Sequence, residues 1–489
     1  MRSVPFVLVT VAALTAGCVG PDFTPPEAPA VKDYTASPLP SATAGTEGVA
    51  GAAQRFQSGA DIPAQWWTLF HSPPLNAMIV EAIAANPNIQ AAEAALKAAR
   101  ENVEAQRGGF WPSLTGGLDA SRTKDSGSVS SNSTSPSPIY NLYTAQIGVS
   151  YSPDVWGANW RQVESLEAQD EAQRFQLEAA HLTLTSNLVG AAVAEAGLRA
   201  QIAAVRSIVA IEAELLGVLK KQAALGQIAE ADVVAQEAAL AQSEQQLPPL
   251  EKQLAQSRNA LAALLGRFPS QSPDATFDLA GLDLPTELPI SLPSKLVAQR
   301  PDVRQAEANL HSASAQVGVA VAARLPLINL TAGMGTTSAI IGGSQGLFTP
   351  GQGFWALGAG LTMPLFDGFT LLHKERAARA LLEQADAQYR ATVITAFQNV
   401  ADALTALVAD ASALKAAVTA EKAAAQSLAI TRRQLELGAV SYLSLLNAQQ
   451  TEQQALITMA QAETNRFADT AALFQALGGG WWNRMPAAE

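Results

Sequence analysis

The chain has 489 residues, a formal net charge of −12 and only 15% charged residues. Its long stretches rich in Ala, Gln, Leu and Glu are typical of packed helices and argue against a mixed α/β enzyme. The acidic balance excludes nucleic acid as a partner, because phosphate binding needs clustered Lys and Arg and the sequence has no such cluster.

The first 17 residues have the pattern of a signal peptide. One positive charge precedes the apolar run 4–16, which is too short to span a bilayer. Cys18 is the only cysteine, so no intrachain disulfide can form. We interpret 1–17 as a lipoprotein signal that is cleaved before Cys18, which then carries lipid such as palmitate. The alternative is a plain secretory signal, because Thr15 stands where lipoprotein signals usually have an aliphatic residue.

Residues 18–65 are rich in Pro, Ala, Gly, Ser and Thr and have no hydrophobic periodicity. This composition predicts an extended, lipid-anchored tether, with regular structure beginning near Trp66-Trp67. No later segment has the ~18 consecutive apolar residues of a transmembrane helix. Any insertion into a membrane must therefore use strands.

The remaining sequence is an internal duplication, with predicted repeats at 66–280 and 281–480 and a C-terminal tail at 481–489. Four pairs of landmarks recur at offsets of 214, 211, 212 and 212 residues. They are Asn86-Pro87-Asn88-Ile89 with Arg300-Pro301-Asp302-Val303, Pro153 and Gly157 with Pro364 and Gly368, Leu225-Gly226 with Leu437-Gly438, and Ala263-Leu264-Leu265-Gly266 with Gln475-Ala476-Leu477-Gly478. Each half is predicted to contain a helix, two strands, a very long helix that ends at a glycine turn, and a closing helix.

The helices differ greatly in predicted length. They are expected at about 75–108, about 300–323, 161–225 and 371–437. At a rise of 1.5 Å per residue, each of the two long helices extends roughly 95 Å. A heptad rhythm of apolar residues predicts coiled-coil packing for both. In the first it includes Leu198, Ile202, Val205 and Val209, with Glu212 as a polar exception.

Four strands are predicted, in two pairs. They lie at about 114–123, 140–151, 327–337 and 354–363. Each has roughly the 9–11 residues that a tilted strand needs to cross an outer membrane. Apolar side chains alternate with small or polar ones, which is the pattern of a membrane barrel. A soluble antiparallel sheet with one wet face is the alternative.

Aromatic residues at the bases of the strands favour the membrane. Those predicted to form an interfacial girdle are Trp111, Tyr151, Trp156 and Phe366. The hairpin linkers 124–139 and 338–353 are rich in Ser, Gly, Thr and Pro, as outward loops would be. Because four strands cannot close a barrel and an open edge cannot lie in lipid, we expect the barrel to be shared between protomers.

An ordered set of motifs resembles the TolC/OprM-type (NodT-like) outer-membrane efflux lipoproteins over nearly the whole mature chain. The motifs are Cys18-Val19-Gly20-Pro21-Asp22-Phe23, Trp66-Trp67, Pro153-Asp154-Val155-Trp156-Gly157, Leu292-Pro293-Ser294, Arg300-Pro301-Asp302-Val303 with Ala306-Glu307, Pro364-Leu365-Phe366-Asp367-Gly368 and Ala476-Leu477-Gly478-Gly479-Gly480-Trp481. The resemblance implies a homotrimer with a twelve-stranded β-barrel in outer-membrane lipid and a hollow helical barrel in the periplasm. It also implies two partners, a periplasmic adaptor (membrane fusion) protein and an inner-membrane RND-type pump.

The glycine turns are predicted to mark the far end of the helical tube. Gly226 and Gly438 end the two long helices, where the periplasmic aperture would narrow. We predict that the aperture opens by an iris-like loosening of the tip helices, which adaptor contact favours.

The residues after the two turns differ. The resemblance places acidic residues after the second turn, at positions that are Ser444 and Asn447 here. In the first half Asp232 is equivalent to Ser444, and Glu230 lies nearby. We hypothesise that Asp232 from three protomers forms a charged ring that favours cations. The alternative is that these acids stabilise the start of a helix through its macrodipole.

No enzyme, cofactor or metal site is predicted. The four histidines are scattered without metal-ligand spacing, and Gly333-Met334-Gly335 lies within a strand pattern rather than before a helix. The resemblance implies passive conduction, as the exit duct of a tripartite efflux system such as those of multidrug export. Two rival classes are a structural coiled-coil envelope lipoprotein, which would not need four matched amphipathic strands, and a periplasmic adaptor lipoprotein, which would have one helical hairpin flanked by β-rich domains.

Overall fold

The computed structural model describes residues 19–124, 139–340 and 346–484. Two compact units form, and each takes segments from both halves of the sequence. Unit 1 consists of Met1–Pro25, Lys97–Ala172 and Glu307–Gln388, and unit 2 consists of Pro26–Leu96, Gln173–Ala306 and Tyr389–Glu489. The predicted signal peptide, Cys18 and the middle of both hairpin linkers lie outside the described residues.

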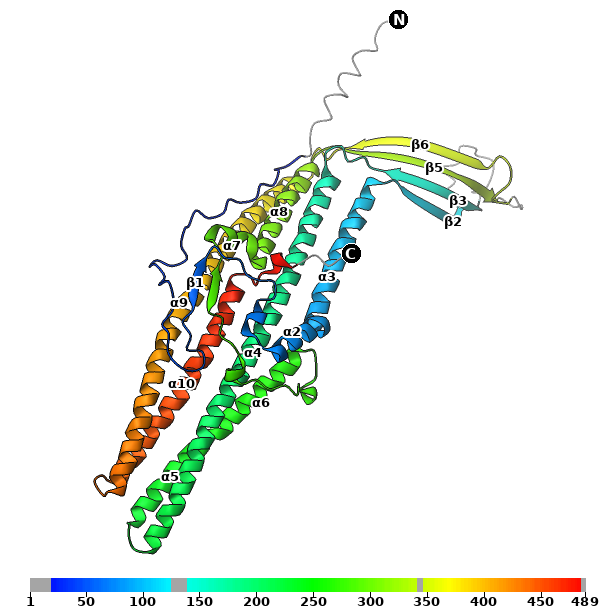
Figure 1. Cartoon of the computed structure of the whole chain (residues 1–489). Helices are drawn as coiled ribbons and strands as arrows, with labels where there is room; N and C mark the ends of the chain where they lie inside the picture. The colour runs from blue at the N-terminus through cyan, green and yellow to red at the C-terminus, as the bar shows by residue number, and fades with distance from the viewer. Residues whose placement is uncertain (1–18, 125–138, 341–345, 485–489) are drawn as a thin grey trace. The chain divides into compact units, whose positions relative to one another are not determined.

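The order of elements predicted for each half is present (Figure 1). The first half contains α2 (Pro73–Ala85), α3 (Pro87–Arg107), β2 (Ser113–Lys124), β3 (Ile139–Tyr151), α4 (Ala158–Ala224), α5 (Glu230–Gln245) and α6 (Leu247–Leu264). The second contains α7 (Pro293–Gln299), α8 (Pro301–Ala322), β5 (Leu327–Ile340), β6 (Gly353–Thr362), α9 (Thr370–Glu436) and α10 (Tyr442–Ala476). The long helices α4 and α9 both have 67 residues, as the duplication predicts.

The prediction of one helix at 75–108 is wrong in one respect, because this segment forms two helices that meet at Asn86. A residue before proline is pushed out of the helical region, and Asn86 is extended (φ −69°, ψ 122°) ahead of Pro87. The Asn86 side chain accepts a hydrogen bond from the Asn88 backbone N–H at 2.8 Å, which caps the start of α3. The same logic separates α7 from α8 at Arg300, before Pro301.

Regular structure begins earlier than predicted, at β1 (Arg55–Ser58) rather than near Trp66. This strand pairs in parallel with β4 (Glu287–Ile290) in unit 2. Local composition could not indicate β1, because its hydrogen-bond partner lies far away along the chain. Short 3-10 helices complete the elements. They are η1 (Trp66–Phe70), η2 (Gly108–Phe110), η3 (Pro269–Gln271), η4 (Leu279–Gly281) and η5 (Trp481–Asn483).

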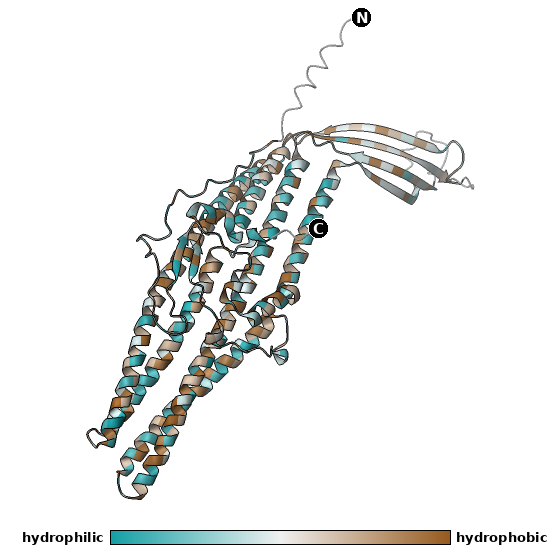
Figure 2. Ribbon diagram, viewed as in Figure 1, coloured by the Kyte–Doolittle hydropathy of each residue, from teal (hydrophilic) through white to brown (hydrophobic). Residues whose placement is uncertain are grey.

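In unit 1 the four predicted strands form one antiparallel sheet in the order β2-β3-β5-β6. Their register places apolar residues in rows on one face, such as Leu114, Val149, Ala332 and Leu357. The opposite face has rows of small residues, such as Thr115, Gly148, Gly333 and Ala356. Figure 2 shows this alternation along the strands. Leu114, Leu118 and Leu357 are each more than 70% exposed, so the apolar face is uncovered within the chain at these rows, although Ser338 on the same face is buried.

In unit 2 the long helices pack through their apolar seams. The buried residues of α9 follow the predicted heptad rhythm and include Val393, Val400, Leu404, Leu407, Ala411 and Leu414. A second part of the core gathers aromatic rings, where Trp66 stacks on Phe474 with ring centroids 5.3 Å apart. By length and composition alone, α9 also contains a window apolar enough to cross a membrane, with a mean hydropathy of 1.4. Gln398, Asn399 and Asp402 interrupt its apolar residues, as expected for a helix in a bundle.

Candidate functional site

Two helical hairpins in unit 2, α4–α5 and α9–α10, carry the predicted aperture residues. Gly226 and Gly438 adopt left-handed backbone conformations, with φ of 71° and 70°. After α4, the Gln227 N–H donates to the Gln222 carbonyl at 2.9 Å, and after α9 the Ala439 N–H donates to the Gln434 carbonyl at 2.8 Å. Both turns are thus Schellman motifs, in which glycine avoids the steric cost of a positive φ.

The next helix of each hairpin begins differently. Glu230 and Asp232 lie in the first turn of α5, where Ala229 offers no side-chain cap. In α10 the cap is Ser441, whose hydroxyl accepts a hydrogen bond from the Ser444 N–H at 3.4 Å. Glu230 and Asn447 are exposed, whereas Asp232 and Ser444 are half-buried. The acids therefore stand where the partial positive charge of a helix N-terminus stabilises them.

The two hairpins pack together through an apolar cluster at the tips. Its buried members are Leu219, Val233, Ala239, Leu428, Tyr442, Leu445 and Leu446. Asp232 and Tyr442 are brought close enough for the carboxylate to disfavour ionisation of the phenol. The predicted aperture residues of the two halves thus belong to one packed group of helices.

A buried polar network, which the sequence reasoning missed, joins the hairpins beside this cluster. The Tyr442 hydroxyl donates to the Gln236 side-chain carbonyl, and the Gln236 amide donates to the Glu212 backbone carbonyl at 3.1 Å. Farther along α5 and α10, the Gln453 amide donates to the Ser243 hydroxyl at 3.3 Å. The sequence contains one sign of this network, because Glu212 interrupts the heptad rhythm of α4.

Burial changes the acid–base properties of this network. Glu212 is only 3% exposed, and burial raises its pKa, although a hydrogen bond from Ser243 opposes the shift. The pKa of Tyr442 is raised, first by burial and then by the charges of Glu212 and Asp232. Both side chains therefore favour their neutral forms, which suits a hydrogen-bonded network away from water.

At the bases of the strands in unit 1, the predicted girdle residues have different environments. Trp111 and Phe366 are 76% and 80% exposed. Tyr151 is half-buried at the end of β3, opposite Leu330. Trp156 is also half-buried, and its indole N–H donates to the Pro326 carbonyl at 2.7 Å.

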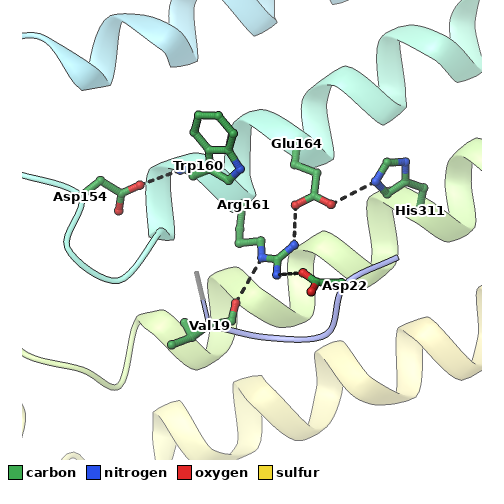
Figure 3. Close-up of polar contacts among 7 residues, drawn as sticks. All are labelled: Val19, Asp22, Asp154, Trp160, Arg161, Glu164 and His311. Atoms are coloured by element: carbon green, nitrogen blue, oxygen red, sulfur yellow. Dashed lines mark hydrogen bonds and ion pairs between the residues drawn. The ribbon is translucent and has the colours of Figure 1, made fainter. Parts of the chain in front are cut away.

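A cluster around Arg161 holds the segment that follows Cys18 (Figure 3). The buried guanidinium donates to the Val19 carbonyl at 3.2 Å and to Asp22 at 2.6 Å. It also pairs with Glu164 at 2.7 Å, and Glu164 lies 3.1 Å from His311. Although burial alone would lower the pKa of Arg161, the two carboxylates raise it. The segment from Val19 to Asp22 is therefore fixed to α4 and lies beside α8, which the sequence alone did not predict.

A second buried arginine holds a later part of the tether, in unit 2. Arg466 of α10 is fully buried and donates to the carbonyl of Ala52 at 3.1 Å, the side chain of Gln54 at 2.9 Å and the hydroxyl of Thr43 at 3.2 Å. Gln54 in turn donates to Thr470 at 2.9 Å. The tether is thus a structured strap rather than a free linker over these residues.

These features define a class of protein. One unit presents a sheet with an uncovered apolar face, and the other contains long paired helices with capped tips, as in channels of the bacterial outer membrane. The solved structure of the outer-membrane channel OprN agrees, with a TM-score of 0.83 and 27% identity over 95% of this chain and 99% of that one.

Sequence comparison identifies the family. The profile of the outer membrane efflux protein family matches twice, at 78–267 and 292–479, so the chain belongs to this family. The pyoverdine export outer membrane protein OpmQ of Pseudomonas putida is 28% identical over 86% of this chain and 89% of its own length. The cation efflux system protein CusC of Escherichia coli is 29% identical over 96% and 97%.

The predicted fold class, outer-membrane location and role in efflux are therefore confirmed. The chain is a subunit of an outer-membrane efflux channel, the exit duct of an efflux system. Its relatives are channel proteins rather than enzymes.

Proposed function

We propose that three copies of this chain assemble into one duct that conducts substrates passively from the periplasm to the outside. The observation that carries this proposal is the four-stranded sheet, whose apolar face is exposed. Its edge strands β2 and β6 each pair with a strand on one side only among the described residues, which leaves two unpaired edges. Unpaired backbone groups are costly in lipid, so strands of other protomers must cover these edges. Three protomers supply twelve strands.

Assembly is tested on the purified chain in detergent. We expect a trimer by light scattering, which migrates as an oligomer on a gel when unheated and as a monomer after heating. A chain that is monomeric and soluble without detergent would exclude the duct and favour a soluble envelope protein.

The partners that we propose are a periplasmic adaptor at the helix tips and an inner-membrane RND-type pump. The two capped hairpins support this, because their exposed turn residues Leu225 and Leu437 offer apolar contacts to a partner. The chain itself would need no cofactor and would catalyse no reaction.

At the aperture we propose that Asp232 from three protomers forms a ring, with Glu230, Ser444 and Asn447 around it. Support comes from the half-buried position of Asp232 in the first turn of α5, where the N-cap residue Ala229 provides no side-chain hydrogen bond. A ring of carboxylates favours cations over anions. In planar bilayers, Asp232→Asn is expected to reduce cation selectivity, whereas Glu244→Gln, which removes an exposed carboxylate farther along α5, serves as the matched control. Unchanged selectivity and gating in Asp232→Asn would mean that Asp232 only stabilises the start of α5 through the helix macrodipole.

Opening is proposed to need separation of the tip hairpins. Cysteines placed at the exposed positions Leu225 and Leu437 and joined by a bifunctional thiol reagent should block export, and reduction of a cleavable reagent should restore it. Cysteines at exposed Phe268, away from the turns, provide the control. Full export with the tip crosslink formed would exclude this mechanism.

We also propose that Cys18 carries the lipid anchor. The contacts of Arg161 with Val19 and Asp22 support this, because they hold the first mature residues beside Trp156, whose carbonyl accepts from the Val19 N–H at 3.2 Å. Mass spectrometry of the mature N-terminus should find acyl chains on Cys18, and an unmodified N-terminus elsewhere would contradict the anchor.

A further inference from the structure

Only three charged residues occur in the four described strands, and all lie in the half of β2 that is distant from the helices. They are Asp119, Arg122 and Lys124. Because side chains alternate along a strand, Arg122 and Lys124 share the apolar face with Leu114 and Leu118, whereas Asp119 is on the other face. The register agrees, since Asp119 lies in a row with Thr144 and Thr337. The sheet thus separates two cations from one acid.

On the apolar face, the cross-strand rows change from apolar to polar with distance from the helices. The rows contain, in order, Leu114, Val149, Ala332 and Leu357; Gly116, Ile147, Met334 and Trp355; Leu118, Ala145, Thr336 and Gly353; Ala120, Tyr143 and Ser338; and Arg122 and Asn141. A tyrosine row between hydrocarbon-like and charged rows is typical of a membrane interface.

The dimensions place the cations at the far side of the membrane. The eight residues from Leu114 to Arg122 extend about 27 Å along the strand, at ~3.4 Å per residue. With a tilt of roughly 40°, this is about 20 Å across the bilayer, close to the ~25 Å apolar band of outer-membrane barrels. The long side chains can extend farther and place their charges among headgroups.

Both cations lack an acidic partner in the part of the chain that the structure describes. Arg122 and Lys124 are exposed, and no ion pair involves either side chain among the described residues. A guanidinium binds two oxygens of a phosphate at once, and an ammonium adds a point charge. The Asn141 amide beside Arg122 is a further donor.

We propose that Arg122 and Lys124, with Asn141 beside them, bind the phosphate groups of an anionic glycolipid of the outer leaflet. The proposal rests on the proposed duct, because the sheet must cross the outer membrane with its β2–β3 end outside. Each protomer contributes one site on the lipid-facing surface, so a trimer holds three. The bound lipid lies against the exposed apolar rows below it and covers them.

The test measures lipid binding to the full-length trimer by native mass spectrometry. The probe is bis-phosphorylated lipid A, and its enzymatically dephosphorylated form has matched acyl chains. For Arg122→Gln with Lys124→Gln we expect about thirtyfold weaker binding of the phosphorylated form, and about fivefold for either change alone, at ~1 kcal/mol per cation. Arg122→Lys should retain most of the affinity. Asp119→Asn is the matched control on the same strand and should leave binding unchanged.

Equal binding of the two lipid forms, or unchanged affinity in the double variant, would overturn the site. Raising the salt concentration should weaken binding of the phosphorylated form to the wild-type trimer. Channel conductance in bilayers without lipid A distinguishes this failure from failure of the duct. A trimer that conducts but does not discriminate between the two lipids rejects only the lipid site, whereas a chain that forms no channel rejects the duct.

Discussion

The two tip hairpins end in the same way but differ in their interiors. Both α4 and α9 finish in a Schellman motif at a glycine with φ near 70°. Inside, the first hairpin contributes Glu212 and Gln236, whereas the positions 212 residues later are Ala424 and Ala448. The second hairpin contributes Tyr442, whose equivalent in the first half is the exposed Glu230.

This difference shows what a duplication retains and what it changes. The turn is retained because backbone geometry requires glycine at both places. The interior has diverged so that each half supplies one side of a hydrogen bond, Gln236 from one and Tyr442 from the other. Neither half could form this contact with a copy of itself.

The largest effect is expected from removing Gln236. Gln236→Leu leaves the buried Tyr442 hydroxyl without its acceptor, which should lower the local opening free energy of α5 and α10 by about 2 kcal/mol. Hydrogen exchange of the backbone amides of these helices measures this change. Gln454→Leu, an exposed glutamine on α10, is the control. Adding Tyr442→Phe to Gln236→Leu should recover much of the loss, because both polar partners are then replaced; no recovery would mean that the contact is unimportant.

Substitution of the turn glycine should destabilise the two hairpins by similar amounts. Gly226→Ala and Gly438→Ala each place a Cβ at a positive φ, and each should destabilise its hairpin by ~1–2 kcal/mol. Nothing lies within 4 Å of the added Cβ at either site, so strain alone decides the effect. Gly217→Ala in the interior of α4 should instead stabilise by about 0.5–1 kcal/mol. Thermal unfolding of the trimer compares the three variants, and clearly unequal losses at the two turns would show that the hairpins are not equivalent even there.

Glu212 should make the tips pH-dependent. Its pKa is raised above the ordinary 4.5 by burial, so the folded state holds this proton more tightly than the unfolded state. The stabilisation is therefore complete below pH 4.5 and is lost as pH rises through the folded pKa. The opening free energy of α4 and α5, obtained from hydrogen exchange after correction for the intrinsic pH dependence of amide exchange, should fall over that range in the wild-type chain and stay constant in Glu212→Gln. The Asp232 carboxylate and the Tyr442 phenol lie near this group, so Asp232→Asn is the control, and an equal pH response in Glu212→Gln would assign the effect to another group.

The smallest effects concern the two helix starts. Asp232→Asn removes a charge from the first turn of α5 and should cost ~0.3–1 kcal/mol. Ser444→Glu creates a capping box with Ser441 and should stabilise α10 by a similar amount. Both shifts should shrink at high salt, as measured by hydrogen exchange at the two N-termini. A loss of stability in Asp232→Asn together with a gain in Ser444→Glu would show that both helix starts respond to a negative charge at this position, and no change in either variant would contradict this role.

Much of the fold could be predicted from the sequence. All four strands are present, and their ends lie at most three residues from those predicted. They could be predicted because apolar and small or polar side chains alternate along a strand that has two different environments on its two faces. The long helices end where the glycine turns indicated. The break at Asn86 was also readable in principle, since Pro87 disfavours a helical residue before it.

The candidate site was predictable only in part. Glycines Gly226 and Gly438 and the acids after the first turn were found, because turn chemistry and helix starts are local. The Gln236–Tyr442 contact and the Arg161 cluster were missed, since each joins residues more than 100 positions apart. Glu212 was noted as an exception, but its burial depends on which helices cover it.

By itself the sequence determined the repeated order of elements, the apolar face of each strand and the seam of each long helix. These depend on periodicity and on the backbone preferences of single residues. Only the tertiary structure decided that β1 pairs with β4, that Arg161 and Arg466 hold the tether, and that each half completes the other at the tips. The reason is physical: a buried polar group must find its partner in space, and distance along the chain does not indicate which partner that is.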